Sequence, residues 1–239
     1  MKKMIGLVPK YIMVGDPQKS CMDDYILVGH CYAKRAIEAG CVPMGLTPVD
    51  GWIPEEALEA CDGFIVQGGP AFHLYHFQVI HHAITHHKKY LGICLGSQLI
   101  YVYLELKRRV EELGYEGDLV KAIYDYQDKY LQGRTIQQKV DGHYSDLPAR
   151  GQEDAAKHDI DIVPGSLLHK IMGRDSMRIC TFHNRCTPPN QTLVPVNAWS
   201  ALGDGVVEGV EYGDNILGVQ GHPEADDLLP ELFAFLAED

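Results

Sequence analysis

The chain has 239 residues, of which 46% are hydrophobic and 23% are charged, so it is long enough to bury a large core. Its formal net charge of −12 argues against a nucleic-acid partner, because the phosphates would be repelled. No run approaches the ~18 apolar residues of a membrane span. The start, MKKMIGLVPK, lacks the apolar length of a signal peptide. Seven cysteines without a disulfide-like framework fit a reducing compartment, so we expect a cytoplasmic protein.

The first part of the chain alternates short apolar runs with amphipathic stretches. We expect strands at 4–9, 41–46, 63–67 and 90–93. We expect a loop over 11–24 and helices at 25–39, 55–60 and 77–88, the first of them capped by Gly40. Strands that alternate with helices predict an α/β fold, with a mostly parallel central sheet flanked by helices on both faces.

The later part of the chain is more varied. Residues 104–132 are charged and carry a broken helical stripe, which predicts two helices interrupted near 114–117. This stretch is a candidate cap over a site or a subunit contact, and a surface helical hairpin without a role is the alternative. Residues 141–157 are polar and predict a loop, and 227–237 predict a closing helix. We expect the sheet to be completed by strands, some of them antiparallel, at 158–163, 177–182, 193–196, 204–211 and 216–220.

The stretch YLGICLGSQLI at 90–100 predicts a nucleophile elbow around Cys94, because a short apolar run is followed by a turn and a helix-like segment. Gly92 and Gly96 lie two residues before and two after Cys94, where side chains would collide in such a strained turn. The start of the following helix would favour thiolate over thiol. A buried structural cysteine is the alternative, and the elbow alone does not exclude it.

A thiolate nucleophile needs a base, and the base needs an acceptor that orients it. The segment QGHPE at 220–224 closes another apolar run, so His222 is a candidate base and Glu224 its candidate partner. A single histidine near a strand end is more often structural. The combination with a cysteine elbow favours catalysis.

The segment GICLGSQ (92–98) together with QGHPE (220–224) resembles the class I glutamine amidotransferase superfamily, whose triad is Cys, His and Glu. Within it, the chain looks most like the gamma-glutamyl-gamma-aminobutyrate hydrolase (peptidase C26) family. Further similar stretches are DGFIVQGGP (62–70), HDIDIVPGSLL (158–168), TFHN (181–184) and DGVVEGVE (204–211). The resemblance implies a flavodoxin-like fold in one domain over 1–239, with a helical insertion at about 101–143.

The resemblance also implies roles for individual residues. Cys94, His222 and Glu224 would be catalytic, and the N–H groups of Gly69 and Leu95 would form the oxyanion hole. Gln98 and His183 match family residues that contact the substrate's glutamyl part and shape the pocket. Where the family continues with His and Gln, this chain has Asn184 and Arg185, and an arginine can grip a substrate carboxylate. Ala71 likewise stands where Asp commonly follows the Gly-Gly-Pro turn.

These features predict a hydrolase that cleaves gamma-glutamyl amides through a glutamyl thioester and acts on a small molecule. We expect no cofactor, metal, nucleic acid or membrane, and the sequence leaves homo-oligomer formation open. The alternatives are a glutaminase subunit that delivers ammonia to a separate synthase, and a non-catalytic sensor or binding module. His82 and His86 could face one metal on a helix, but a solvated helix face is the better interpretation. His73 and His76 are candidates for the pocket wall.

Overall fold

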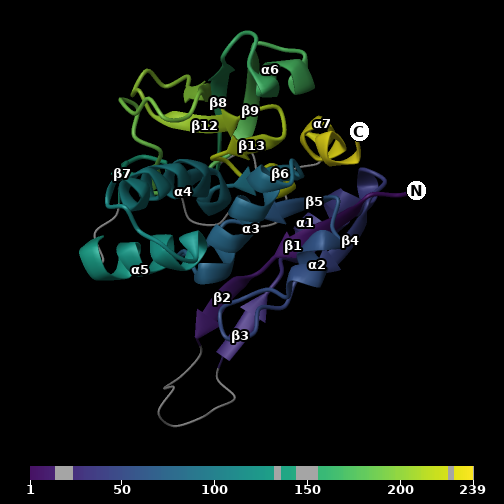
Figure 1. The fold of residues 1–239 in the computed structure, drawn as a ribbon. Helices are drawn as coiled ribbons and strands as arrows, with labels where there is room; N and C mark the ends of the chain where they lie inside the picture. Colours follow the sequence, from purple (N-terminus) through teal and green to yellow (C-terminus); the bar gives the residue numbers. More distant parts are fainter. Residues whose placement is uncertain (14–23, 132–135, 144–155, 226–228, 239) are drawn as a thin grey trace.

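The computed structural model describes residues 1–13, 24–131, 136–143, 156–225 and 229–238. A nine-stranded sheet with the order β4-β1-β5-β6-β13-β12-β11-β8-β9 forms its centre (Figure 1). The strands of this sheet are β1 (Met4–Val8), β4 (Val42–Gly45), β5 (Gly63–Val66), β6 (Lys89–Ile93), β8 (Lys157–Ile162), β9 (Ser176–Cys180), β11 (Val196–Ser200), β12 (Val207–Tyr212) and β13 (Ile216–Val219). Two small antiparallel pairs join β2 (Lys10–Met13) to β3 (Asp24–Leu27) and β7 (Gln138–Lys139) to β10 (Arg185–Cys186).

The strands β4, β1, β5, β6 and β13 pair in parallel, whereas the neighbours from β13 to β9 pair antiparallel. The sheet is therefore parallel where the elbow lies, and the predicted α/β fold is confirmed. The pairing of β6 with β13 aligns Ile93 with Val219, so the residues that follow these two strands come together. Active sites of parallel sheets form at this carboxyl edge.

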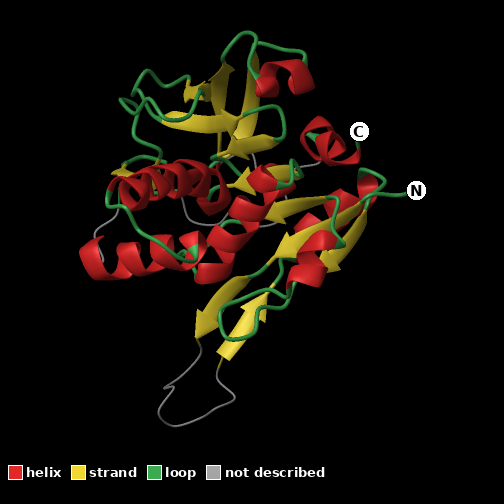
Figure 2. Ribbon diagram, in the orientation of Figure 1, coloured by secondary structure: helices red, strands yellow, loops and turns green. Residues whose placement is uncertain are grey.

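Helices cover both faces of the sheet (Figure 2). They are α1 (His30–Glu38), α2 (Glu55–Glu59), α3 (Leu74–Thr85), α4 (Leu95–Glu112), α5 (Leu119–Leu131), α6 (Leu167–Met172) and α7 (Pro230–Ala234). Successive side chains of a strand point to opposite faces. In β5, Phe64 and Val66 join the core that contains residues of α2 to α5, and Ile65 joins the core with residues of α1, α6 and α7. None of the described helices is both long and apolar enough to cross a bilayer.

Two predictions near the N-terminus are wrong. The predicted loop at 11–24 is wrong at its two ends, which lie in β2 and β3, and 14–23 lie outside the described residues. The predicted helix at 25–39 begins only at His30, because residues 24–27 form β3. The extended Gly29 separates β3 from α1, and its N–H donates to Gln67 Oε1 at 3.1 Å. The apolar side chains of β3 are exposed. Their spacing therefore did not reflect the buried face of a helix, and the helix prediction failed there.

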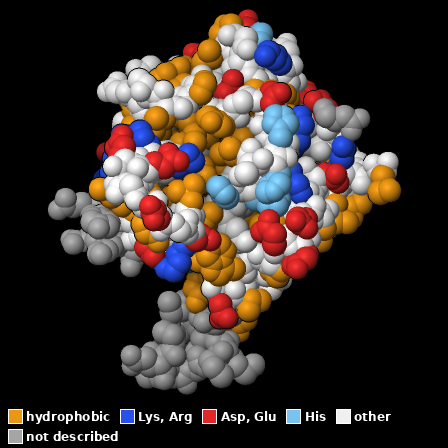
Figure 3. All heavy atoms as spheres, in the orientation of Figure 1, with side chains coloured by type: hydrophobic (Ala, Val, Ile, Leu, Met, Phe, Trp, Pro, Cys, Tyr) orange, Lys and Arg blue, Asp and Glu red, His pale blue; other side chains and the backbone are white. Residues whose placement is uncertain are grey.

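The predicted strand at 193–196 is shifted, because β11 starts at Val196. Before it, Gln191 Oε1 accepts the N–H groups of Leu193 and Val194, which holds this segment in a turn. The predicted pair of helices at 104–132 is present as the second part of α4 and α5. The break between them contains Gly114 and Gly117, both at positive φ. On the face shown in Figure 3, acidic and basic side chains are interspersed rather than gathered into a continuous basic surface.

Candidate active site

Cys94 lies between β6 and α4 with φ 52° and ψ −104°, a conformation that residues with side chains adopt rarely and at a cost. The flanking glycines make this turn sterically feasible. A Cβ atom added to Gly92 would lie 2.4 Å from the carbonyl oxygen of Gly96, and one added to Gly96 would lie 2.2 Å from that of Val66. The predicted elbow geometry is therefore present around Cys94.

The thiol and the candidate base meet beside Gly68. A Cβ atom at Gly68 would lie 3.3 Å from Cys94 Cβ and 2.9 Å from His222 Cε1, so the missing side chain leaves room for both. Cys94 N donates to Val219 O at 2.9 Å, which fixes the elbow against β13. Cys94 Sγ is partly exposed and lies 4.0 Å from Phe182 O. The sulfur thus faces an open space beside the imidazole.

Glu224 orients His222, and Tyr32 in turn holds Glu224. His222 Nδ1 lies 2.7 Å from Glu224 Oε1, and the Tyr32 hydroxyl donates to the same oxygen at 2.6 Å. Burial opposes the imidazolium, but Glu224 and Cys94 raise the pKa of His222 well above its ordinary value. Burial also opposes the Glu224 carboxylate, but His222 and Tyr32 keep its pKa below the ordinary value. The pair is therefore suited to exchange a proton with the sulfur.

Replacing Tyr32 with Phe removes one hydrogen bond to this buried carboxylate. We expect a loss of ~1.5–3 kcal/mol, which is roughly ten-fold or more in kcat/KM if the bond is fully formed in the transition state. Because Tyr32 helps to lower the pKa of Glu224, its removal should also shift the acid limb of the pH profile to higher pH. The exposed Tyr25 provides the control Tyr25→Phe. Equal profiles for the two variants would contradict the role of Tyr32.

A cavity of about 930 Å³ opens above the elbow. Its wall contains all eight residues to which the sequence assigned a catalytic, oxyanion or substrate-binding role: Gly69, Cys94, Leu95, Gln98, His183, Arg185, His222 and Glu224. Leu95 is the first residue of α4, so its N–H belongs to the helix-start amides that have no partner inside the helix. A Cβ atom at Gly69 would lie 3.3 Å from Leu95 Cδ2, which places the two backbones close together. Their oxyanion role stays a prediction.

Gln98 is bound by the protein itself. Its Nε2 donates to Arg185 O at 2.7 Å and to Gln220 Oε1 at 3.0 Å, and its Oε1 accepts from Gln137 Nε2. His183 Nδ1 lies 3.1 Å from Arg185 O. Gln98 and His183 therefore both support the backbone of Arg185, and their predicted contact with substrate stays a prediction.

The histidines of α3 do not build the site. His76 is buried, and its Nδ1 accepts the N–H of His73 at 2.9 Å, which caps the helix. Neither His73 nor His76 lies in the wall of the described cavity, so both were wrong candidates. The ring of His82 stacks on that of His86, and His82 Nδ1 lies 2.8 Å from Glu55 Oε1. The sequence did not predict this acidic partner.

Sequence reasoning missed Tyr32 and Arg35, which lie on α1. Arg35 Nε donates to Glu224 O at 3.3 Å. Both lie inside the predicted helix at 25–39, and Glu224 is 192 positions after Tyr32. No local pattern indicates such a contact.

Comparisons with known proteins identify the family of the chain. Residues 70–224 match the model of the peptidase C26 family, which covers more than half of the chain, and the chain therefore belongs to that family; the match does not test the geometry of the site. The CTP synthase of Chlamydia caviae is 33% identical over 116 residues, which is 47% of this chain and 20% of that protein. The match thus spans only about a fifth of the length of that relative.

Two solved structures show the same fold. The glutaminase domain of Trypanosoma brucei CTPS with bound acivicin has a TM-score of 0.61 at 20% identity, over 99% of this chain and 93% of that one. A glutamine amidotransferase from Thermotoga maritima has a TM-score of 0.54 at 15% identity, over 94% and 77%. The predicted class I glutamine amidotransferase-like fold is confirmed. Family and fold together define a hydrolase of the glutamine amidotransferase type.

Proposed function

We propose that this chain is a cysteine-dependent hydrolase of gamma-glutamyl amides, similar to gamma-glutamyl-gamma-aminobutyrate hydrolase, with its catalytic domain formed by residues 1–239. The observation that carries the proposal is the strained Cys94 beside a buried His222–Glu224 pair, at the wall of a cavity. These three residues would form the triad. A non-catalytic module would not need a strained thiol next to an oriented base.

The reaction would run in two steps. The Cys94 thiolate attacks the gamma-carbonyl, and the N–H groups of Gly69 and Leu95 stabilise the negative charge on oxygen. The C–N bond then breaks, His222 gives its proton to the leaving amine, and a glutamyl thioester remains. In the second step His222 takes a proton from water, and the hydroxide attacks the thioester. Glutamate leaves, and Cys94 and His222 return to their starting forms.

The helical stretch after the elbow would cover part of the site. The cavity wall includes Val102 on α4, Gln127 on α5 and the neighbouring Ile136 and Gln137. This placement supports a capping role for the proposed insertion at 101–143, in preference to a surface hairpin without a role.

A glutaminase subunit that delivers ammonia to a synthase is the second candidate. It is favoured by the similarity of this chain to a CTP synthase and to the glutaminase domain of a CTPS. The two candidates differ in the leaving group, because glutamine releases only ammonia. Arg185 lies in the cavity wall and could pair with a carboxylate on a larger amine.

The substrate test therefore compares gamma-glutamyl-gamma-aminobutyrate with glutamine, with no partner protein present. A charge-assisted hydrogen bond contributes about 1.5–3 kcal/mol. We expect kcat/KM to favour the acidic amide by roughly ten- to over a hundred-fold. Arg185→Ala should remove this preference, whereas Arg178→Ala, an exposed change on β9, should keep it. Weak activity on both substrates, with glutamine hydrolysis switched on by a synthase from the same cell, would favour the ammonia-donating subunit.

A further inference from the structure

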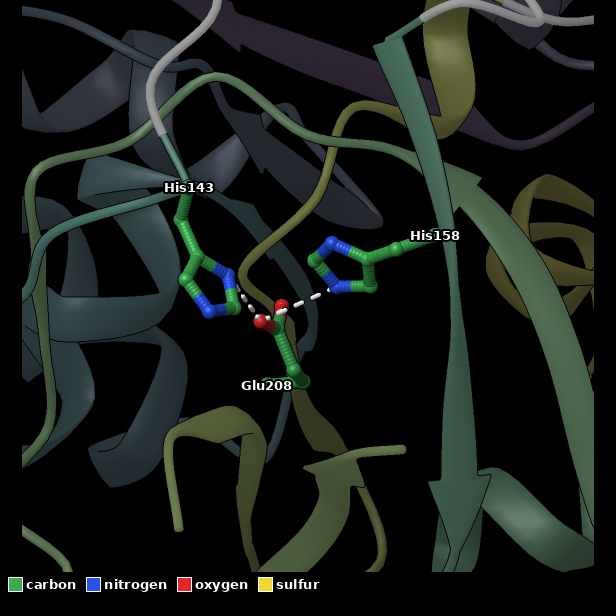
Figure 4. Close-up of side chains that lie close together, drawn as sticks. All are labelled: His143, His158 and Glu208. Carbon is green, nitrogen blue, oxygen red and sulfur yellow. Dashed lines mark ion pairs between the residues drawn. The ribbon is translucent and has the colours of Figure 1, made fainter. Parts of the chain in front are cut away.

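Behind the cavity wall, three histidines surround one glutamate. His143 follows β7, His158 lies on β8, His183 follows β9, and Glu208 lies on β12. His143 Nδ1, His158 Nε2 and His183 Nε2 lie 3.0, 3.2 and 3.4 Å from Glu208 Oε1. Figure 4 shows the rings of His143 and His158 turned toward the carboxylate. We call these four side chains the His–Glu cluster.

The His–Glu cluster is buried, and the atoms through which its members face one another have no hydrogen-bond partner among the described residues. Glu208 is 0% exposed, His143 1% and His183 3%. The three ring nitrogens that face Glu208, and both carboxylate oxygens, have no partner with hydrogen-bond geometry among the described residues. Burying several such groups without hydrogen bonds is costly. Buried polar atoms that converge on one point without hydrogen bonds are typical of a cation site.

The far nitrogens of two rings show which tautomer they carry. His143 Nε2 lies 2.7 Å from Asp204 Oδ2, and His183 Nδ1 lies 3.1 Å from Arg185 O. Both partners are acceptors, so each of these nitrogens carries the proton. In the neutral rings the lone pairs of the other nitrogens then point at the carboxylate, which is repulsive unless a cation lies between them. A ligating histidine that donates its other N–H to a carboxylate or a carbonyl is the usual arrangement at metal sites.

We propose that His143, His158, His183 and Glu208 bind one divalent transition-metal ion, zinc by the nature of the donors. Imidazole nitrogens and carboxylate oxygens are both donors that zinc takes, and four of them complete a tetrahedral site. With ligands at about 2.0–2.2 Å, a tetrahedral ion keeps its donors roughly 3.3 Å apart, and the three spacings around Glu208 match this. The facing atoms of His143, His158 and Glu208 all lie within 4.8 Å of one another, so binding would draw the widest pair together.

The ion would have a structural role. It would join β8 and β12 to the segments that carry His143 and His183, and His183 also lies in the cavity wall. Its ligands are separate from Cys94, His222 and Glu224, so the site is distinct from the proposed chemistry. The sequence-based expectation of no metal considered only histidines that are neighbours in the chain.

A proton is the competitor of the metal. Metal binding must displace any proton from the rings, so affinity should fall as the pH falls.

The test measures metal directly and needs no substrate. The full chain, stripped with a chelator and then given Zn²⁺ alone, should bind one equivalent by elemental analysis, and its Tm should rise with Zn²⁺ concentration. Co²⁺ in place of zinc should give the visible absorption bands of a tetrahedral complex with nitrogen and oxygen ligands. Glu208→Gln should abolish the bound zinc, the rise of Tm with Zn²⁺ and the Co²⁺ absorption bands. The matched control is His86→Gln. His86 lies at the C-terminal end of α3, outside the His–Glu cluster, so this variant should bind Zn²⁺ and Co²⁺ like the wild type.

A graded variant keeps the proposal testable if Glu208→Gln does not fold. Asp204→Asn keeps the side-chain shape and leaves all four ligands in place, but it weakens the support of His143. It should lower zinc affinity about 10- to 100-fold without loss of the folded state. Absence of stoichiometric Zn²⁺ and Co²⁺ binding to the wild type would overturn the proposal. So would equal binding by the wild type and a folded Glu208→Gln variant.

Discussion

Replacing Cys94 with Ala should lower the turnover of gamma-glutamyl amides by roughly 10⁴-fold or more while the free energy of unfolding stays close to that of the wild type. The loss is large because the proposed thioester cannot form without the sulfur. The fold should persist because the sulfur lies beside a cavity and alanine keeps the Cβ atom of the elbow. Steady-state kinetics and urea unfolding measure the two quantities independently.

The control is Cys31, which also lies in the cavity wall. Burial and the nearby Glu224 raise the pKa of the Cys31 thiol, so it should stay protonated and unreactive. An electrophilic glutamine analogue should label the wild type and Cys31→Ala once each, and Cys94→Ala not at all. Labelling that survives in Cys94→Ala would refute Cys94 as the nucleophile. In a double variant, His222→Ala should add little further loss, because the triad acts as a unit.

Gly96→Ala should destabilise the protein by roughly 3 kcal/mol or more. The new Cβ atom would lie 2.2 Å from the carbonyl oxygen of Val66, and the backbone of a central strand cannot move away as a side chain can. Alanine is favoured over glycine in a helix by only about 0.5–1 kcal/mol. The clash should therefore outweigh the helix preference, and urea unfolding would show the difference.

Gly45→Ala is the matched control for this substitution. Gly45 lies on the edge strand β4 with ordinary φ, and a Cβ atom there meets nothing within 4 Å. Its free energy of unfolding should stay within about 0.5 kcal/mol of the wild type. If Gly96→Ala were as stable as Gly45→Ala, the close approach of the elbow to β5 would be wrong.

The parallel half of the sheet was predictable because each of its strands is a short apolar run bounded by turn residues. The predictions at 63–67 and 90–93 match β5 and β6 within one residue. The β2–β3 pair was not predictable from hydrophobicity. The apolar residues of β3 stay on the surface, so burial did not select their spacing.

Local motifs made part of the site predictable. The nucleophile and its two glycines lie within five residues, so the geometry of the elbow could be read from them directly. The His–Glu cluster draws its side chains from four segments, one of which was expected to be only a polar loop. The stretches HDIDIVPGSLL, TFHN and DGVVEGVE contain three of its four members, but only the fold brings them together. The catalytic roles of the triad stay predictions until the Cys94 variant is measured.

Two polar side chains of the cavity wall, Gln98 and His183, have little hydrogen-bonding capacity left for a ligand. Both Nε2 protons of Gln98 have acceptors in the protein, and Gln137 occupies one of the two lone pairs on Oε1. The two ring nitrogens of His183 face Arg185 O and Glu208. Gln98 can thus accept a hydrogen bond from a substrate ammonium but cannot donate one to a carboxylate, and His183 can offer only the carbon atoms of its ring. Recognition of the acidic ends of a substrate therefore falls to other donors of the wall, among them the cations Lys10 and Arg185.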